Sequence, residues 1–304
     1  MPAVQRSGED AAREFNCTEA CHRDSISIMT GIRVTSHAEM LYMSTIRVLT
    51  ERVGATRPES GAAFVVSDEG NERFLVTARH VVSGVARLTL HLYTGDSVHT
   101  IGAPLRYEVG GDEQFWVYHA DSDVDVAVAR FEPIADLFER NNEDFFAGAL
   151  PFSSFQPKFQ PGRESFTDKF WRPLPLDEVL LVGYPNDYRD VSTSLPLLRR
   201  GRIATPLWLD HEGRPVFLVD STAAHGTSGG PVAYVEEEHH VGRTMHEGTG
   251  KITLLGVFSE VLPLRAPGVR AADGVPQRPP NVGAAYKAYT ILEAIAALKR
   301  RTSA

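Results

Sequence analysis

Short segments rich in Val, Thr, Ile and Phe recur along this chain, and turn-forming residues separate them. β-Branched and aromatic side chains favour strands, while the 25 Gly and 19 Pro residues suit turns. The first half predicts strands over residues 44–50, 61–66, 73–78, 86–93, 114–119 and 124–131. The second half predicts strands over residues 178–185, 198–204, 215–220, 230–235, 251–259 and 282–289. The pattern therefore predicts an all-β fold in two units.

Helical signals flank these strands. Ser36 and Glu39 have capping-box spacing, which predicts a short helix ahead of the first strand. Thr290 and Glu293 have the same spacing near the C-terminus, where a basic last turn suits the negative end of a helix dipole. The apolar face expected for this last helix consists of Ile291, Leu292, Ile295 and Leu298.

Residues 132–176 separate the two sets of strands and are dominated by Pro, Gly and polar residues. We expect this segment to connect the two units, with a short helix near residues 134–141. Its aromatic side chains are expected to pack onto the body of the protein rather than to form a free binding surface. These aromatics are Phe155, Phe159, Phe166, Phe170 and Trp171.

Composition restricts the class of protein. Hydrophobic residues make up 42% of the 304 residues and charged residues 23%, as in globular soluble chains. The net charge of −8 and the absence of a basic tract argue against nucleic acid or anionic membrane as a partner. No apolar run approaches the roughly 20 residues of a membrane span. The only cysteines, Cys17 and Cys21, fit a cytoplasmic protein without structural disulfides.

Two segments have the composition of metal sites, but the sequence favours a plainer interpretation for each. Cys17, Cys21 and His22 supply three of the four ligands that structural zinc needs, so we expect a polar N-terminal arm instead. Residues 236–250 contain Glu238, His239, His240, His246 and Glu247 without a recognisable ligand spacing. A solvated insertion is the favoured interpretation, and a divalent-ion site is the alternative. The sequence therefore predicts no metal and no cofactor.

Three residues, His80, Asp125 and Ser228, occur in an order that suits nucleophilic catalysis. A serine hydroxyl is a weak nucleophile that needs a base, and a histidine base needs a carboxylate to fix its tautomer. Asp125 directly precedes the apolar strand VAVARF, and Asp123 has the same strand parity and remains the alternative.

Ser228 lies within the sequence GTSGGP, where small residues let the backbone approach a substrate closely. The N–H groups of Gly226 and Ser228 are the candidate donors to an oxyanion. Taken alone, Ser228 also fits a turn and His80 a structural histidine. Their occurrence in order with Asp125 favours the catalytic interpretation.

These motifs together resemble those of the trypsin-like, chymotrypsin-fold serine proteases, and specifically the bacterial HtrA/DegP-like branch. LVTARHVV is similar to the histidine motif, DVAVARF to the aspartate motif and DSTAAHGTSGGPV to the serine motif of that branch. VGYP and NVGAAYKAYTILEAI look like its second-barrel and terminal segments. The resemblance covers roughly residues 43–298.

The resemblance implies two six-stranded antiparallel β-barrels with a C-terminal helix, and peptide-bond hydrolysis through an acyl-enzyme without metal or cofactor. The implied order is an N-terminal arm (1–42), a first barrel (43–135), a connection (136–176), a second barrel (177–289) and a helix (290–304). The alternative is a latent or inactive fold that binds proteins. An α/β-hydrolase esterase fits poorly, because its triad order is Ser, Asp, His.

The chain also departs from the family pattern. Thr227 stands where digestive relatives have an Asp that pairs with a newly cut N-terminus, so that activation switch is not expected. HtrA proteins usually carry a PDZ domain, which this sequence does not show, so a regulatory partner protein is expected instead. By resemblance, Thr222 lies at the base of the specificity pocket and predicts a preference for a small or aliphatic residue. The other implied substrate contacts are His225, which also fits a solvated loop, and Ser259, Glu260 and Val261.

Overall fold

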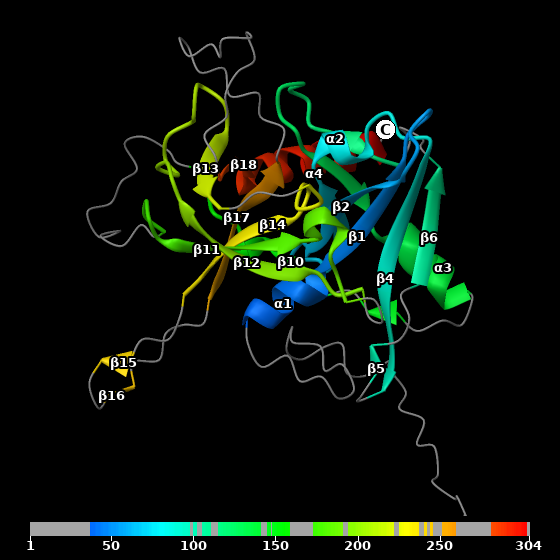
Figure 1. Ribbon diagram of the computed structural model, residues 1–304, viewed down its shortest axis with the longest axis horizontal. Helices are drawn as coiled ribbons and strands as arrows, with labels where there is room; N and C mark the ends of the chain where they lie inside the picture. Colours follow the sequence, from blue (N-terminus) through cyan, green and yellow to red (C-terminus); the bar gives the residue numbers. More distant parts are fainter. Residues whose placement is uncertain are drawn as a thin grey trace, which may run out of the picture.

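The structure is a computed structural model, and two β units and a long C-terminal helix make up its body (Figure 1). It describes residues 37–97, 100–101, 105–110, 115–140, 145–146, 148–158, 173–190, 194–221, 225–236, 240–241, 244–245, 251–259 and 281–302. Among these residues, no helix has both the length and the apolar character needed to cross a membrane.

The first unit is a mostly antiparallel sheet. Its sheet has the order β5-β4-β1-β2-β3-β8-β7, while β6 and β9 pair with β4, and β10 pairs in parallel with β2. The strands are β1 (Thr45–Glu51), β2 (Glu59–Ser67), β3 (Arg73–Thr77), β4 (Arg87–Ser97), β5 (Thr100–Ile101), β6 (Leu105–Gly110), β7 (Val117–Tyr118), β8 (Ala127–Arg130), β9 (Phe145–Phe146) and β10 (Leu150–Pro151). The turn between β2 and β3 is closed by Asn71, whose φ of 63° lies in the left-handed region.

The second unit is a closed barrel with the order β11-β12-β13-β18-β17-β14. Its strands are β11 (Glu178–Gly183), β12 (Leu197–Ile203), β13 (Val216–Asp220), β14 (Pro231–Val235), β17 (Ile252–Ser259) and β18 (Val282–Lys287). Each coincides with a predicted strand, and the predicted six-stranded barrel is confirmed here. Two further short strands, β15 (His240–Val241) and β16 (Thr244–Met245), pair with each other inside the 236–250 insertion.

The first unit differs in detail from a closed six-stranded barrel. Its ten strands have two ends, β5 and β7, which do not pair with each other in the described part of the chain. Strand β4 has eleven residues and pairs with β1 and with the three short strands β5, β6 and β9. None of these three strands was predicted, although residues 105–109 of β6, LRYEV, alternate apolar and polar side chains.

The predicted helices are present with small changes. Helix α1 (His37–Ser44) precedes β1, and α3 (Glu132–Arg140) follows β8. The connection continues through a turn of 3-10 helix, η1 (Phe152–Ser154), to Phe155, which is buried and 5.2 Å from the Phe152 ring. The other connection aromatics, Phe159, Phe166, Phe170 and Trp171, lie outside the described residues, as does the N-terminal arm.

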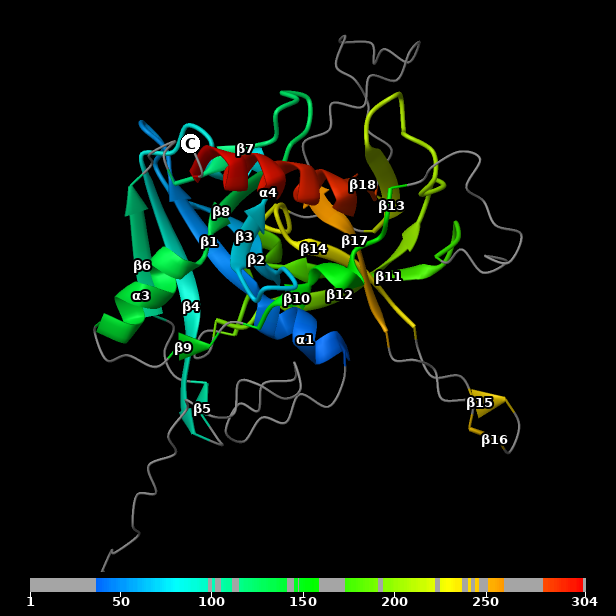
Figure 2. The same cartoon turned by 180° about the vertical axis from the view of Figure 1, so that it is seen from behind.

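Helix α4 (Ala288–Thr302) crosses the back of both units (Figure 2). The capping box expected at Thr290 is wrong. Strand β18 runs directly into the helix, so Thr290 already lies inside the first turn and its hydroxyl donates to the Lys287 carbonyl at 2.8 Å. Glu293 instead accepts from His119 at 3.1 Å and pairs with Lys158 at 3.3 Å.

The apolar face of α4 completes a core that the two units share. Ile291, Ala294, Ile295 and Leu298 are buried and belong to one apolar cluster with side chains of both units. Leu292, which the sequence placed on this face, is only partly buried. The helix therefore joins the units through apolar contacts, and it packs on β7, β8 and β17.

Truncating this face should reduce stability. We expect Ile295→Ala to lower the free energy of unfolding by about 2–5 kcal/mol, since Ile295 is only 2% exposed and a cavity would remain. Urea unfolding followed by tryptophan fluorescence measures the change. Arg300→Ala, on the exposed face of the same helix, is the control and should change it by less than about 0.5 kcal/mol. Equal effects would contradict the assigned core face.

Candidate active site

His80 lies on a single helical turn that follows the buried end of β3. This turn is α2 (Arg79–Val82), and the Ser83 amide closes it on the Arg79 carbonyl at 2.8 Å. Arg52 donates to the His80 carbonyl at 2.6 Å and to the Ser83 carbonyl at 2.7 Å. These bonds place a guanidinium at the carbonyl end of the turn, where a cation is favourable. The backbone that carries the imidazole is therefore fixed.

Asp125 faces His80 with both carboxylate oxygens. Oδ1 accepts from the His80 backbone amide at 2.8 Å, and Oδ2 lies 2.6 Å from His80 Nδ1. In neutral imidazole this places the proton on Nδ1 and leaves Nε2 as the acceptor. Asp123 is exposed, and its carbonyl accepts from the Tyr286 hydroxyl at 2.8 Å. Of the two candidate carboxylates, the structure thus pairs Asp125 with the histidine.

A third group fixes the same carboxylate. The Ser259 hydroxyl, on β17 of the second unit, donates to Asp125 Oδ2 at 2.7 Å. Burial alone would raise the pKa of Asp125, but the hydrogen bond and charge of His80 and the bond from Ser259 outweigh it and lower the pKa. The carboxylate is therefore ionised, and a residue from each unit holds it.

Ser228 lies where the second unit meets the first. Its carbonyl accepts from the Ala62 amide at 2.9 Å, which joins the loop to strand β2. A Cβ at Gly61 would lie 2.7 Å from the Val81 side chain and 3.5 Å from the Ser228 carbonyl oxygen. The turn that carries His80 and the segment that carries Ser228 therefore both lie against the backbone of Gly61, where there is no room for a side chain.

The glycines of this segment are required by close contacts. Gly229 has a φ of 85°, and a Cβ there would lie 2.1 Å from the Ala62 oxygen and 2.3 Å from Thr77 Oγ1. Gly226 has a φ of 92°, and a Cβ there would lie 2.1 Å from the Tyr184 oxygen. Both positions exclude a side chain by backbone conformation and by space. The serine is thus presented on a loop that is pressed against both units.

The structure places the remaining candidate residues as follows. His225 is exposed, while Thr227 is buried with no hydrogen-bond partner for its hydroxyl within the described residues. Ser259 is 1% exposed and its hydroxyl binds Asp125, while the substrate contact predicted for its backbone stays a prediction. Thr222, Glu260 and Val261 lie outside the described residues.

The described residues contain no group of three His, Cys, Asp or Glu side chains that could hold a metal. Of the insertion's candidate ligands, Glu238, His239, His246 and Glu247 are outside the described residues, and His240 is described only as part of β15.

Arg52 could not be identified from the sequence as a residue that holds the His80 turn. A charged residue just past the end of a strand gives no local signal. Its contact with the His80 turn, 28 residues away in the chain, depends on the antiparallel pairing of β1 with β4, which brings these segments together.

The Asp125 carboxylate should make stability depend on pH. Because its pKa is lowered from an unfolded value of about 3.9, its ionised form stabilises the fold above that value. This contribution is lost as the pH falls through the folded-state pKa. We expect Asp125→Asn to lower the free energy of unfolding by about 1–3 kcal/mol at pH 7. In urea unfolding the difference from wild type should stay constant above about pH 5 and shrink as the pH falls below about 4. A difference that stays constant below about pH 4 would contradict the assignment.

The family model described as trypsin-like peptidase domain matches residues 61–242. No curated protein is similar enough to count as a match.

Solved structures with a similar arrangement include three proteases. The HtrA-type protease AlgW with tripeptide has 14% identity and a TM-score of 0.46, over 86% of this chain and 63% of that chain. The Rv3671c protease from M. tuberculosis has 15% identity and a TM-score of 0.40, over 94% and 93%. The serine endoprotease from Yersinia pestis has 14% identity and a TM-score of 0.43, over 88% and 68%.

This chain therefore spans less than two thirds of the length of the AlgW chain. The family match covers more than half of the sequence, from β2 to the insertion after β14, and includes His80, Asp125 and Ser228. The chain belongs to the family of trypsin-like peptidase domains.

Proposed function

We propose that the protein is a serine endopeptidase that hydrolyses peptide bonds through Ser228, His80 and Asp125. The observation that carries the proposal is the 2.6 Å contact between His80 Nδ1 and Asp125 Oδ2. The Ser228 carbonyl and the turn that carries His80 both lie against Gly61. Membership in the trypsin-like peptidase family supports the same chemistry. Ser228 is the nucleophile, His80 is its base, and the Asp125 carboxylate orients the base.

In the first step, Ser228 Oγ attacks the carbonyl carbon of the scissile peptide bond. His80 Nε2 takes the serine proton, and the negative carboxylate of Asp125 stabilises the resulting imidazolium. The oxyanion is stabilised by the backbone N–H groups of Gly226 and Ser228. His80 then gives its proton to the leaving nitrogen, the C–N bond breaks, and an acyl-enzyme remains on Ser228.

In the second step, water attacks the acyl carbon while His80 Nε2 takes a proton from it. The C–O bond to Ser228 breaks, and His80 returns the proton to Ser228 Oγ. A carboxylic acid product leaves and the enzyme is regenerated. The fixed backbone of α2 and the bonds to Asp125 keep the imidazole in one orientation through both steps, which lowers the entropy cost of the reaction.

The substrate is a protein or peptide, with a small or aliphatic residue before the cleaved bond. This preference rests on Thr222, by resemblance, and on the lack of a carboxylate in the place that would select Lys or Arg. His225, which is exposed beside Gly226, is part of the proposed substrate surface together with Glu260 and Val261. A cytoplasmic location and a regulatory partner protein belong to the same proposal, and neither nucleic acid nor membrane is an expected partner.

Serine nucleophilicity can be tested with a fluorophosphonate probe. We expect the wild type to be labelled, and Ser228→Ala and His80→Ala to lose labelling, because the first lacks the nucleophile and the second lacks its base. Casein hydrolysis by the two variants should fall by about 10⁴-fold or more. Gel fluorescence after labelling and a fluorescent casein assay measure the two effects.

Circular dichroism of each variant confirms that the fold is kept. Labelling that survives in Ser228→Ala would reject Ser228 as the nucleophile. A folded wild type that is neither labelled nor active would favour the alternative, an inactive trypsin-like fold that binds proteins.

Cleavage preference can be measured independently. Mass spectrometry of a peptide library digested by the wild type should show Ala, Val or other small or aliphatic residues before the cut. A preference for Lys or Arg at that position would contradict the proposed pocket, whereas the assignment of the nucleophile would stand.

A further inference from the structure

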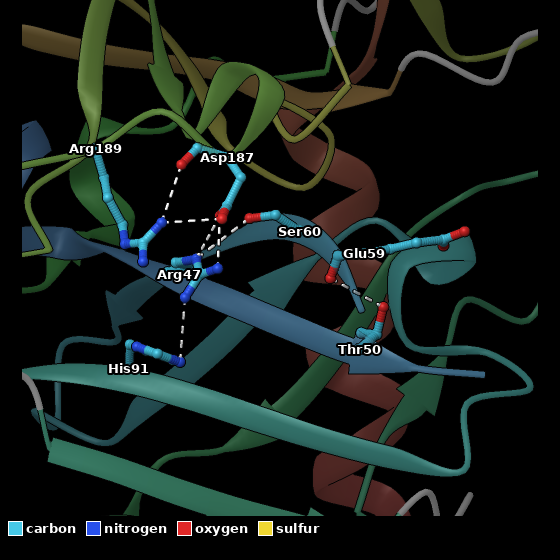
Figure 3. A network of polar contacts seen from close by, with 7 residues as sticks. All are labelled: Arg47, Thr50, Glu59, Ser60, His91, Asp187 and Arg189. Atoms are coloured by element: carbon cyan, nitrogen blue, oxygen red, sulfur yellow. Dashed lines mark hydrogen bonds and ion pairs between the residues drawn. The ribbon is translucent and has the colours of Figure 1, made fainter. Parts of the chain in front are cut away.

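A buried arginine, Arg47, joins the two units through Asp187 (Figure 3). Arg47 lies in the middle of β1, and only 5% of its side chain is exposed. Its Nε and Nη2 donate to Asp187 Oδ1 at 2.7 Å and 2.6 Å. Asp187 belongs to the second unit, where it ends the 3-10 turn η2 (Pro185–Asp187) after β11. The ion pair thus links strand β1 to the loop after β11.

The carboxylate of Asp187 is held from a second side. Arg189 Nη1 donates to Asp187 Oδ2 at 2.9 Å and to the Asp187 carbonyl at 3.1 Å. Asn186 and Asp187 have φ values of 51° and 61°, a left-handed conformation that Asn and Asp tolerate better than most residues. Two arginines therefore stabilise a loop whose backbone is in an uncommon conformation.

Arg47 is positioned by its other neighbours as well. Nη1 lies 3.3 Å from His91 Nε2 on β4, and Nε lies 3.4 Å from the Ser60 hydroxyl (Figure 3). Burial, followed by the positive charges of Arg47, Arg106 and Arg189, lowers the pKa of His91 to about 4. His91 is therefore neutral at pH 7, and its Nε2 accepts from Arg47, which has only donors.

The loop that Asp187 ends holds the backbone before Ser228. The Asn186 amide donates to the His225 carbonyl at 2.6 Å, and the Tyr184 amide donates to the Gly226 carbonyl at 3.0 Å. The Tyr184 oxygen fills the space where a Gly226 side chain would be. Residues 184–187 and 225–226 are thus in direct backbone contact, and a shift of one segment moves the other.

We propose that Arg47 and Asp187 are positioning residues for the oxyanion-binding amides. Their ion pair fixes residues 184–187 against β1, and these residues in turn fix the peptide planes around Gly226. The inference rests on the proposed function, because it assigns the pair to the loop that would bind the oxyanion. Neither side chain is proposed to contact the substrate.

The cost of breaking the pair differs for its two members. Without Asp187, the buried Arg47 charge loses its anionic partner, which costs stability. Without Arg47, Asp187 remains bonded to Arg189 and is 42% exposed, so it can turn toward solvent. Arg47→Met therefore releases the loop at a smaller electrostatic cost than Asp187→Asn. Comparing the two variants separates the loss of loop positioning from the cost of leaving a buried charge without its partner.

The test measures fluorophosphonate labelling over a range of probe concentrations. The phosphonyl oxygen occupies the position of the oxyanion, so its reaction requires correctly placed amides. We expect Arg47→Met and Asp187→Asn to lower the maximal labelling rate by about 10- to 100-fold, as small misplacements of catalytic groups do. The half-saturating probe concentration should change less than about threefold. Asp187→Glu, which keeps the charge, should restore part of the rate.

The matched control is the ion pair between Lys287 and Asp210, with a bond of 2.6 Å. Its side chains are 9% and 47% exposed, close to the 5% and 42% of Arg47 and Asp187. Lys287→Met and Asp210→Asn remove a similar buried ion pair, but none of its hydrogen bonds reaches residues 184–187 or 225–228. We expect a comparable fall in melting temperature and an unchanged labelling rate.

The outcomes distinguish this inference from the proposed function. If the wild type is labelled at Ser228 and Asp187→Asn is labelled equally fast, the positioning role is wrong and the peptidase proposal stands. The positioning role is also wrong if the control variants lose labelling to the same extent, since general destabilisation would then explain the loss. If the folded wild type is not labelled, the proposed function fails first. Additive effects in the Arg47→Met/Asp187→Asn double variant would show that the residues do not act as a pair.

Discussion

The close approach of residues 226–230 to the ends of β2 and β3 is the contact on which the arrangement of the two units depends. The Ser228 carbonyl accepts from Ala62, and Gly229 lies against the backbone of Ala62 and Ala78 with no room for a side chain. A hydrogen bond between Gly229 and Phe258 ties the same segment to β17. One short loop therefore forms contacts with both sheets, and its glycines make these contacts possible.

Buried polar groups at the junction of the two units fix the positions of their neighbours, at some cost in the stability of the fold. Asp125 and Arg47 are mostly withdrawn from water, and each is compensated by bonds from both units. Compensation is incomplete, because the Thr227 hydroxyl and His91 Nδ1 are buried without a partner in the described residues. An apolar replacement of such ion pairs often stabilises a protein. Their presence beside the Ser228 loop fits a requirement for defined positions more than one for stability.

Much of the fold could be predicted because strand periodicity is a local signal. All six strands of the second barrel coincide with predicted strands, and Asp125 was preferred over Asp123 because it abuts an apolar run. Strand β6 was missed although its residues alternate, and the Thr290 cap was misplaced because a strand enters the helix without a break. Arg47 and Asp187 could not be paired from sequence, since 140 residues separate them and only the meeting of two sheets brings them together. The same holds for Ser259 and Asp125, which are 134 residues apart.

Helix α4 has a consequence for how the chain is assembled during synthesis. Its apolar face covers β8 of the first unit, yet residues 288–302 leave the ribosome after every strand of both units. The first unit can form its sheet early, but β7 and β8 stay without their helical cover until α4 is made. Domain-by-domain folding, which is common in two-unit chains, therefore cannot be completed here. The protein should therefore reach its native state in one late cooperative step, when α4 packs on β7, β8 and β17.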